Sequence, residues 1–478
     1  MNSALDTIAA QSPATAEWLE CIQLELGTGV VLSRSENKWC ISGDARRIAF
    51  TLTPGTIASI LSAIMEGGMQ LSELVPLLAG NDGRLQVGEQ IERLWRAGFL
   101  AQSVRYQGTR IAKLHHRGDV PMVPAGVNPS ERLRITAQAS VRYQRGGAIV
   151  ESTASGSYVQ VMAEGLSWLT LPISDSTDCI QWARAAAQPV PVMIALSAWL
   201  RQIGALEACD YQISEPERGL GWSFADRMMH ARSRKGRHVG GYGGTFRFVG
   251  LFSEPPAVKN ESGRSCIHLP EPQLEEIIKR DPPFTEVFES RRSIRQHGSV
   301  PPTLDRLGEF LYRTCRVKRQ AVSQERELAL RPYPSAGGCH ELEIYPLINQ
   351  CAGIDSGLYR YDGSTHSLLH VAEPGPNTAE LINDARQCAM MTREPHILLL
   401  ISARFLRVSW KYESLAYSLT LKNVGVLFQS MYLVATAMGL APCALGGGPS
   451  DSLSRLINED FWQESAVGEF LLGEPAPN

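Results

Sequence analysis

The stretch EPHILLLISARFLRVSWKYESLAYS, residues 394–418, joins an apolar run to a long helical pattern. Residues 394–405 contain the continuous apolar run ILLLI, which is typical of a central strand. The segment VGVLFQSMYLVATAMGLA, residues 424–441, follows it and predicts a buried helix. Lys411 and Tyr412 stand between the two, so they are either a catalytic pair at the mouth of that helix or a surface pair that closes the strand.

The long apolar segment, residues 424–441, also has the length of a membrane span. It contains Gln429, Ser430 and Thr436, however, and Pro442 follows it directly. No second span and no basic flank accompanies it. We therefore expect a helix buried in a large core or in a subunit interface, and no membrane as a partner.

The pattern around this segment predicts an α+β domain over residues 284–478. Residues 304–315 place apolar side chains on one helical face, and residues 340–348 alternate as a strand. A hairpin is predicted over residues 357–371, with Asp-Gly in its turn. A further helix is expected at residues 378–391.

A cluster of basic side chains begins the candidate site. Arg291, Arg292, Ser293 and Arg295 follow a predicted helix within five residues. Guanidinium groups match the oxygens of a phosphate, so the cluster is a candidate phosphate site. Solvated charges at a helix end are the alternative.

Two turns of small residues complete the candidate binding residues. The first contains Pro334, Ser335, Ala336, Gly337 and Gly338, and the second contains Leu445, Gly446 and Gly447. Small residues allow the backbone to approach a flat ring, and exposed backbone N–H groups can hold an anion. An ordinary loop and a helix-ending turn are the alternatives.

Catalysis by the Lys411–Tyr412 pair sets a condition on its environment. A lysine, with an ordinary pKa of about 10.4, acts as a base near neutral pH only if burial or a neighbouring cation lowers that pKa. A tyrosine beside it can relay the proton or orient a substrate.

The N-terminal half contains a repeat. Residues 91–100 match residues 197–206 at an offset of 106, and a glycine ends the predicted helix in both copies. Each copy combines short strands with two or three small helices, so we predict two winged-helix-like modules, over residues 1–112 and 125–215.

These modules lack the basic face that a nucleic-acid reader needs. No lysine occurs between Ser157 and Leu206, and the whole chain of 478 residues has a formal net charge of −3. A peptide added to a sheet edge is a better ligand. Modules that only brace a catalytic domain are the alternative.

The remaining features place the chain in a reducing compartment. None of the ten cysteines forms a C-x-x-C pair, so no zinc site or thioredoxin-like pair is indicated. The N-terminus lacks the pattern of a signal peptide, and we predict a cytoplasmic protein. Residues 216–283, rich in glycine and then in proline, are predicted to be a connector.

The order R-R-S-x-R, P-S-A-G, K-Y, apolar helix and G-L-x-x-C-x-x-G-G resembles the nitroreductase-like FMN oxidases of ribosomal peptide biosynthesis. Within them it is similar to the streptolysin-type azoline dehydrogenases. The tandem modules and the segment SRKGRH…GGTFRF resemble the cyanobactin oxidases among these. The winged modules resemble peptide-clamp domains that recognise a leader peptide.

The resemblance implies that FMN lies at a homodimer interface and that thiazolines or oxazolines of a precursor peptide become thiazoles or oxazoles. Oxygen would reoxidise the flavin, and a cyclodehydratase would be a further partner. Lys411 and Tyr412 match the catalytic Lys-Tyr pair, and the two small-residue turns match the flavin site. No Lys or Arg follows Arg455, so the phosphate would rest on Arg291, Arg292 and Arg295.

Two other functions are compatible with the same sequence. A general NAD(P)H-dependent FMN reductase of nitroaromatics or quinones would share the fold and the flavin, but it would not need the tandem modules. A peptide-binding scaffold without catalysis would support a partner cyclodehydratase and bind no flavin.

Overall fold

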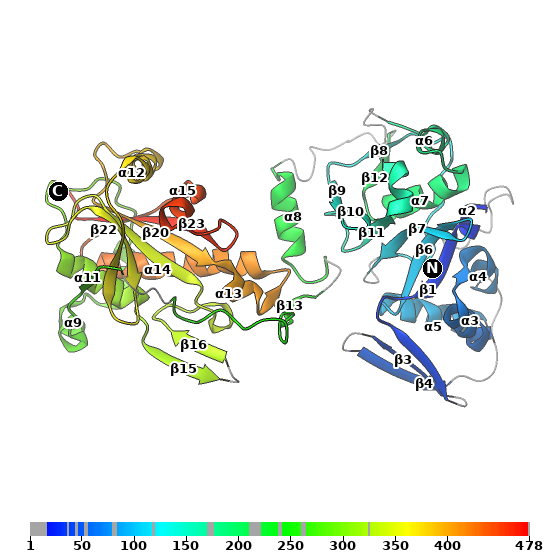
Figure 1. Cartoon of the computed structure of the whole chain (residues 1–478), viewed down its shortest axis with the longest axis horizontal. Coiled ribbons are helices and arrows are strands. Elements are labelled where there is room, and N and C mark those ends of the chain that lie inside the picture. The colour runs from blue at the N-terminus through cyan, green and yellow to red at the C-terminus, as the bar shows by residue number, and fades with distance from the viewer. Residues whose placement is uncertain are drawn as a thin grey trace. The chain divides into compact units, whose positions relative to one another are not determined.

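A computed structural model describes most of the chain, in two compact units over residues 1–240 and 241–478 (Figure 1). The described residues are 17–35, 38–43, 46–51, 56–78, 84–116, 120–169, 176–209, 221–237, 241–259, 264–323 and 326–476. The first sixteen residues, on which the prediction of no signal peptide depends, lie outside these ranges. Each unit is described by itself.

The second unit is built on a seven-stranded sheet in which all neighbouring strands are antiparallel. In spatial order its strands are β14 (Cys266–His268), β19 (Ser367–Ala372), β18 (Gly357–Asp362), β17 (Leu342–Ile348), β20 (Ile397–Arg404), β23 (Glu464–Gly473) and β22 (Ala441–Ala444). The apolar run near residue 400 thus forms an inner strand, β20, between β17 and β23, as predicted.

Helices cover both faces of this sheet (Figure 1). One face carries α11 (Leu304–Cys315) and α14 (Ala416–Ala437), and the other carries α12 (Pro376–Cys388) and α15 (Ser450–Ile457). Side chains of β20 alternate between the two cores: Ile397, Leu399 and Ile401 enter the first, and Leu398 and Leu400 enter the second. A strand buried on both faces is apolar at every position, which explains the continuous run.

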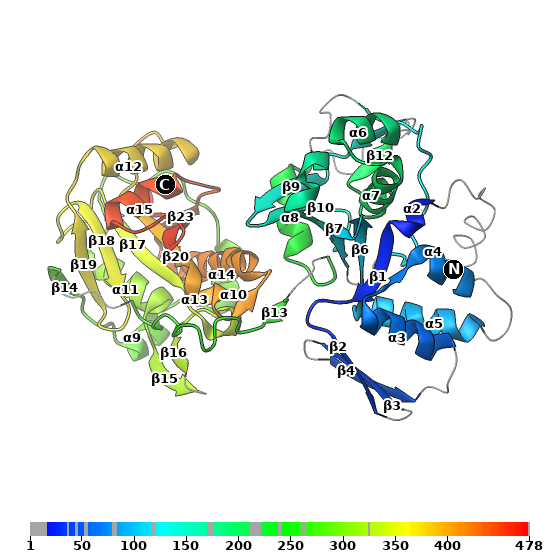
Figure 2. The same ribbon diagram turned by 45° about the vertical axis from the view of Figure 1, so that its right-hand side comes forward.

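Shorter elements flank the sheet. They are β13 (Gly243–Gly244), α9 (Leu274–Arg280), α10 (Phe284–Ser290), β15 (Arg319–Ser323), β16 (Arg326–Leu330), the 3₁₀ turn η3 (Ala336–Gly338), α13 (Phe405–Ser409) and β21 (Tyr412–Glu413). β15 and β16 form a separate hairpin beside the sheet (Figures 1 and 2). β13 and β21 pair with each other as a second small ribbon.

The α+β class predicted for the C-terminal region is confirmed, with differences at the element ends. α14 begins at Ala416 and ends at Ala437, and Ala441 already belongs to strand β22. Throughout the described ranges, no helix combines the length and apolarity needed to cross a membrane. The predicted connector, residues 216–283, contains α8 (Phe224–Arg232) in the first unit and β13, β14 and α9 in the second.

The first unit has its own seven-stranded sheet. In spatial order it contains β5 (Met69–Gln70), β1 (Ile22–Leu26), β6 (Leu100–Tyr106), β7 (Thr109–His115), β11 (Tyr158–Met162), β10 (Gly147–Ser152) and β9 (Ala139–Gln144). A three-stranded sheet is formed by β2 (Val31–Ser35), β3 (Lys38–Gly43) and β4 (Arg46–Thr51), and β8 (Leu133–Ile135) pairs with β12 (Leu206–Ala208). Its helices are α2 (Glu17–Glu20), α3 (Thr56–Glu66), α4 (Leu71–Leu78), α5 (Arg84–Arg96), η2 (Ala163–Leu169), α6 (Cys179–Ala186) and α7 (Val190–Gln202).

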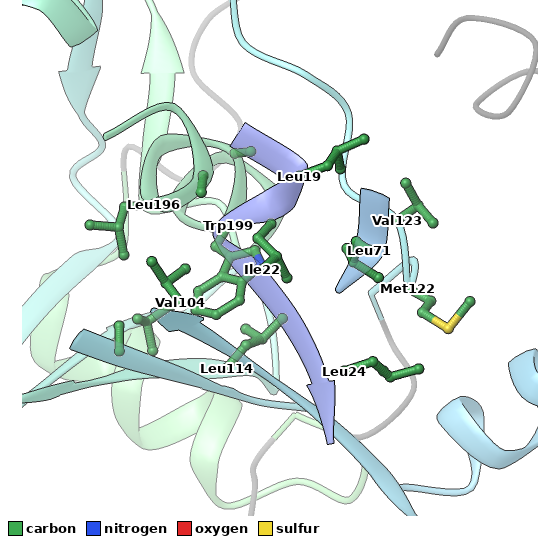
Figure 3. Close-up of a cluster of buried hydrophobic side chains, with 14 of the residues drawn as sticks. Leu19, Ile22, Leu24, Leu71, Val104, Leu114, Met122, Val123, Leu196 and Trp199 are labelled. Carbon is green, nitrogen blue, oxygen red and sulfur yellow. The ribbon is translucent and has the colours of Figure 1, made fainter. Parts of the chain in front are cut away.

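A single hydrophobic core runs through both predicted modules (Figure 3). The indole of Trp199, from α7, lies among Ile22, Val104 and Leu114 of the sheet. Its Nε1–H donates to the side-chain oxygen of Gln102 at 3.2 Å, so the indole nitrogen keeps a partner although it is buried. The winged-helix-like assignment and the module boundaries stay predictions.

The repeated sequences end two helices in the same way. The N–H of Phe99 donates to the carbonyl of Leu94 after α5, and the N–H of Ala205 donates to the carbonyl of Leu200 after α7. The intervening Gly98 and Gly204 have φ values of 78° and 75°. The left-handed residue after a helix is usually glycine, and both copies of the sequence repeat end their helix in this way.

Candidate active site

The Lys411 side chain lies on the loop of small residues. Its Nζ donates a hydrogen bond of 3.1 Å to the carbonyl oxygen of Gly337. Gly337 has φ +59°, and a Cβ atom there would clash with Lys411 Nζ and the Tyr412 hydroxyl. The structure therefore brings two of the predicted segments together, and the contact requires glycine at position 337.

A buried polar network holds the start of this loop. The amide of Asn423 on α14 donates to a carboxylate oxygen of Glu341 at 2.8 Å and to the Ser335 hydroxyl at 3.1 Å. Its side-chain oxygen accepts from the backbone N–H of Ala336 at 3.1 Å. Glu341 is fully buried, and the Ser335 hydroxyl is used to fix the loop.

Arg407 holds the other end of the loop. Its guanidinium is completely buried and donates to the carbonyls of Cys339, at 3.0 Å, and Glu327, at 2.7 Å. An ion pair of 2.7 Å with Glu254 balances its charge. The loop backbone is thus fixed from two sides before any ligand is present.

Burial determines the protonation of several groups around the pair. It raises the pKa of the Tyr412 hydroxyl and of the Cys339 thiol. Burial, with Arg331 and Arg407 nearby, lowers the pKa of His340 to about 4, so this imidazole is neutral at neutral pH. His340 also has φ +46°, an uncommon backbone conformation for a residue with a side chain.

The predicted arginine cluster lies against the end of α14 and the strand β22. The Ser293 hydroxyl lies 2.7 Å from the Tyr432 hydroxyl, which accepts from the N–H of Ala444 at 2.8 Å. The Arg291 guanidinium lies 5.2 Å from the Tyr432 ring centre. Burial raises the pKa of Cys443 in β22, and the nearby Arg295 opposes this effect.

The glycine turn follows β22 directly, so it is next to these arginines. Leu445 is buried, and its N–H donates to the carbonyl of Glu469 at 2.9 Å. A Cβ atom at Gly446 or Gly447 would meet nothing within 4 Å, so this backbone is open. Under the turn, burial raises the pKa of the Glu469 carboxyl to about 7.

Arg291, Arg292 and Arg295 have no carboxylate partner at ion-pair distance within the described ranges. Arg292 and Arg295 are exposed, and Arg291 is half-buried. Unpaired guanidiniums beside an open backbone turn are suited to a phosphate-bearing molecule.

The same helix, α14, positions both clusters. Asn423 contacts the loop of small residues, and Tyr432 contacts the arginine segment. Nine residues correspond to two and a half helical turns, so these side chains lie on opposite flanks of α14, roughly 13 Å apart along its axis. Within one chain, the Lys411 cluster and the arginine cluster are therefore separate.

Sequence reasoning missed the residues that support the site. Asn423, Glu341, Arg407 and Tyr432 are all buried or half-buried polar groups whose partners are remote in sequence. In the sequence, these residues are marked only as polar residues at apolar positions of the long helix or next to an apolar strand.

Comparisons with known proteins find similarity in the second unit. Residues 288–472 match the model of the Nitroreductase family. A protein of Methanocaldococcus jannaschii, provisionally named a nitroreductase, is 29% identical over 186 residues, which are 39% of this chain and 87% of the relative.

Solved structures of low sequence identity are also similar. One is a structure from Anabaena variabilis, provisionally named a nitroreductase, which is 21% identical and has a TM-score of 0.36. The match covers 51% of this chain and 45% of the chain in that structure. A chain of the E. coli microcin synthetase McbBCD complex with truncated pro-MccB17 is 20% identical, covers 37% of this chain and 66% of its own, and has a TM-score of 0.32. The family match over residues 288–472 gives the second unit a nitroreductase-fold domain of the α+β class, and the chain carries an additional unit of helices and strands before it.

Proposed function

We propose that this chain is an FMN-dependent oxidase that dehydrogenates thiazolines or oxazolines of a ribosomally made precursor peptide. The observation that carries the proposal is the Lys411 Nζ held at the Gly337 carbonyl, beside Tyr412, on a loop of small residues. It supports the proposal because a proton-handling pair then lies beside the loop that would line a flat ring.

The residues fit FMN as the cofactor. Arg291, Arg292 and Arg295 supply unpaired guanidiniums for a phosphate, and the open backbone at Gly446 and Gly447 accepts a flat or anionic group. Ser293 keeps the segment in place through Tyr432. Pro334, Ser335, Ala336, Gly337 and Gly338 would line the ring, with Leu445 below the second turn.

Aromatisation removes a proton from the α-carbon and a hydride from the adjacent ring carbon. When bound, FMN would supply the hydride acceptor for this step, and oxygen would be the final electron acceptor. Lys411, as the neutral amine, takes the proton at its Nζ and becomes an ammonium, and Tyr412 orients the ring or relays that proton. The loop supplies the orientation that makes the transfer efficient, because its ends are already fixed by Asn423 and Arg407.

The separation of the two clusters supports a homodimer. Because the arginine segment and Lys411 lie on opposite flanks of α14, we infer that a second copy completes the site. The outer face of α14 exposes Leu421 (41%) and Val426 (36%), and the first turn of the helix exposes Tyr417 (50%). Apolar side chains on the outer face of a long helix are typical of an interface.

The first unit would bind the precursor peptide, and a cyclodehydratase would supply its azolines. β9 is an edge strand of that unit, and its half-exposed or exposed side chains leave it accessible to strand addition. We place the protein in the cytoplasm, where such peptides are made.

The test is the absorption spectrum of the purified protein, followed by mass spectrometry after incubation with a heterocyclised peptide. We expect a bound flavin and a mass decrease of two hydrogen atoms for each azoline. A flavoprotein that consumes NADPH with a quinone but leaves azolines unchanged would instead be a general reductase. A colourless protein that takes up no flavin would be a binding scaffold.

A further inference from the structure

A segment outside the family match lies directly on the Lys411–Tyr412 pair. We call residues 241–259 the strap; they precede residues 288–472, which match the Nitroreductase family. In the ribbon of β13 and β21, Gly244 pairs with Tyr412 and Gly243 pairs with Glu413. The N–H of Phe246 then donates to the carbonyl of Lys411 itself, at 3.2 Å.

The far end of the strap is anchored in the domain. Arg326 holds the Glu254 carboxylate with two hydrogen bonds, of 2.7 and 2.6 Å. Lys259 forms an ion pair of 2.8 Å with Glu464, whose carboxylate is buried. Charge-assisted bonds at buried groups are strong, so the strap has a defined position over the pair.

Phe246 is the residue of the strap that reaches Lys411. The Lys411 Nζ lies 5.8 Å from the centre of its ring. The ring packs edge-on against Trp410, with 6.0 Å between ring centres, and the Arg326 guanidinium lies 5.5 Å from it. The partners of this ring therefore come from strand β16 and from the two residues that precede β21.

The backbone of Phe246 is strained. Its φ is +51°, in the left-handed region that bulky side chains rarely adopt. Such a conformation persists only where the surrounding structure imposes it, and it is concentrated at functional sites. Here the bonds from Phe246 N–H to Lys411 and from Val249 N–H to the Phe246 carbonyl, at 3.0 Å, impose it.

We propose that Phe246 is a positioning residue for Lys411, an inference that rests on the proposed function. A lysine side chain has a flexible stem of four carbons. A base must be held within reach of the proton that it takes. Three groups hold the Nζ: the Gly337 carbonyl, the Tyr412 ring at 5.2 Å and the Phe246 ring. The ammonium that forms as Lys411 takes the proton is attracted to an aromatic face within about 6 Å.

The test compares Phe246→Leu, Phe246→Tyr and the matched control Phe252→Leu. Phe252 lies in the same strap, and its ring packs on Phe248. We expect Phe246→Leu to lower kcat on the order of tenfold, with KM for the peptide unchanged, because one cation–π contact is lost. Phe246→Tyr keeps the ring and retains kcat, and Phe252→Leu behaves as wild type.

A second readout does not depend on turnover. Site-resolved labelling with an amine-reactive reagent, followed by peptide mass spectrometry, reports how firmly Lys411 is held. Phe246→Leu should increase labelling at Lys411 several-fold, whereas Phe252→Leu should leave it unchanged. In a Lys411→Ala background, Phe246→Leu should cause no further loss of the residual rate, because the two residues act as one unit.

The outcomes separate the two proposals. If the wild type forms azoles but Phe246→Leu matches it in kcat and in Lys411 labelling, the inference is overturned and the proposed function stands. If Phe246→Leu lowers the rate by the same factor in Lys411→Ala as in the wild type, Phe246 has only a structural role. That result also overturns the inference. A wild type that binds flavin but forms no azole refutes both.

Discussion

The Nζ atom of Lys411 lies 3.1 Å from the carbonyl oxygen of Gly337, which joins segments 74 positions apart in the sequence. Lys411 follows the inner strand β20, and Gly337 belongs to the turn before β17. These two strands are neighbours in the sheet, so its topology creates the contact. The loop backbone is itself part of the candidate site.

Gly337→Ala should therefore abolish most of the azole formation. The added Cβ would clash with the Tyr412 hydroxyl and with Lys411 Nζ. The positive φ adds a cost of about 1 kcal/mol in the free energy of unfolding. Mass spectrometry measures the loss in the rate of azole formation, and denaturant unfolding measures the loss of stability.

Gly439→Ala, just after α14 and outside the candidate site, is the matched control for that substitution. Its φ of +66° carries the same backbone cost, but its Cβ would meet nothing within 4 Å. We expect a similar loss of stability and a much smaller loss of rate. Equal rates for the two variants would disprove a special role for position 337.

Asn423→Ala should destabilise the domain and loosen the loop. The substitution removes a donor at 2.8 Å from the fully buried Glu341 carboxylate and the acceptor of the Ala336 N–H. Leaving such groups unpaired costs about 1–3 kcal/mol. Asn423→Asp should be worse at neutral pH, since it brings a second carboxylate to Glu341; thermal unfolding of both variants checks this order.

The sequence predicted those parts of the fold that local patterns encode. The inner strand β20, helix α11 and the hairpin of β18 and β19 have clear apolar periods or turn residues, and the structure contains all three. The small-residue loop and the Lys411–Tyr412 pair were recognised because of their unusual composition, and the structure brings them together.

Elements that depend on long-range contacts have weaker patterns in the sequence. Strand β23 (Glu464–Gly473) completes the sheet beside β20, yet its sequence mixes charged and apolar residues because Glu464 and Glu469 are buried with it. The strap was predicted as a connector, since glycine-rich segments resemble linkers. Its role depends on pairing with β21 and on the Glu254 and Lys259 ion pairs, which only the folded structure creates.

Glu469→Gln should alter how stability depends on pH. Burial raises the pKa of this carboxyl from 4.5 to about 7, so the folded state holds its proton more tightly than the unfolded state. The protonated carboxyl therefore contributes its full share of the free energy of unfolding below pH 4.5. That contribution, about 3 kcal/mol, is lost as the pH rises through 7. The glutamine variant should gain stability at pH 8 and change little at pH 4.

Unfolding at several pH values tests this, with the exposed Glu275→Gln as the control. The control should keep the wild-type slope. A Glu469→Gln protein that loses stability at pH 8 would show that the buried carboxylate has a stabilising partner in its charged form.

Leu421→Glu should convert a dimer into a monomer. Leu421 is 41% exposed on the outer face of α14, where a second copy would pack. A charge at the centre of an apolar interface leaves an unpaired ion on association. Light scattering measures the mass, and Val322→Glu, at a 73% exposed position of β15, should keep the wild-type mass. A wild type that is already a monomer contradicts the proposed interface.

Two glycines test whether the sequence repeat of the first unit is a repeat of structure. Gly98 and Gly204 end α5 and α7 with φ of 78° and 75°, so each alanine variant should lose about 1 kcal/mol from backbone strain. A Cβ at Gly98 meets nothing within 4 Å, whereas one at Gly204 lies 2.7 Å from the Ala154 Cβ. Gly204→Ala should therefore cost measurably more, by about 1–3 kcal/mol of overpacking. Denaturant unfolding of the two variants decides this, and a larger loss for Gly98→Ala would show that the two helix ends are not equivalent.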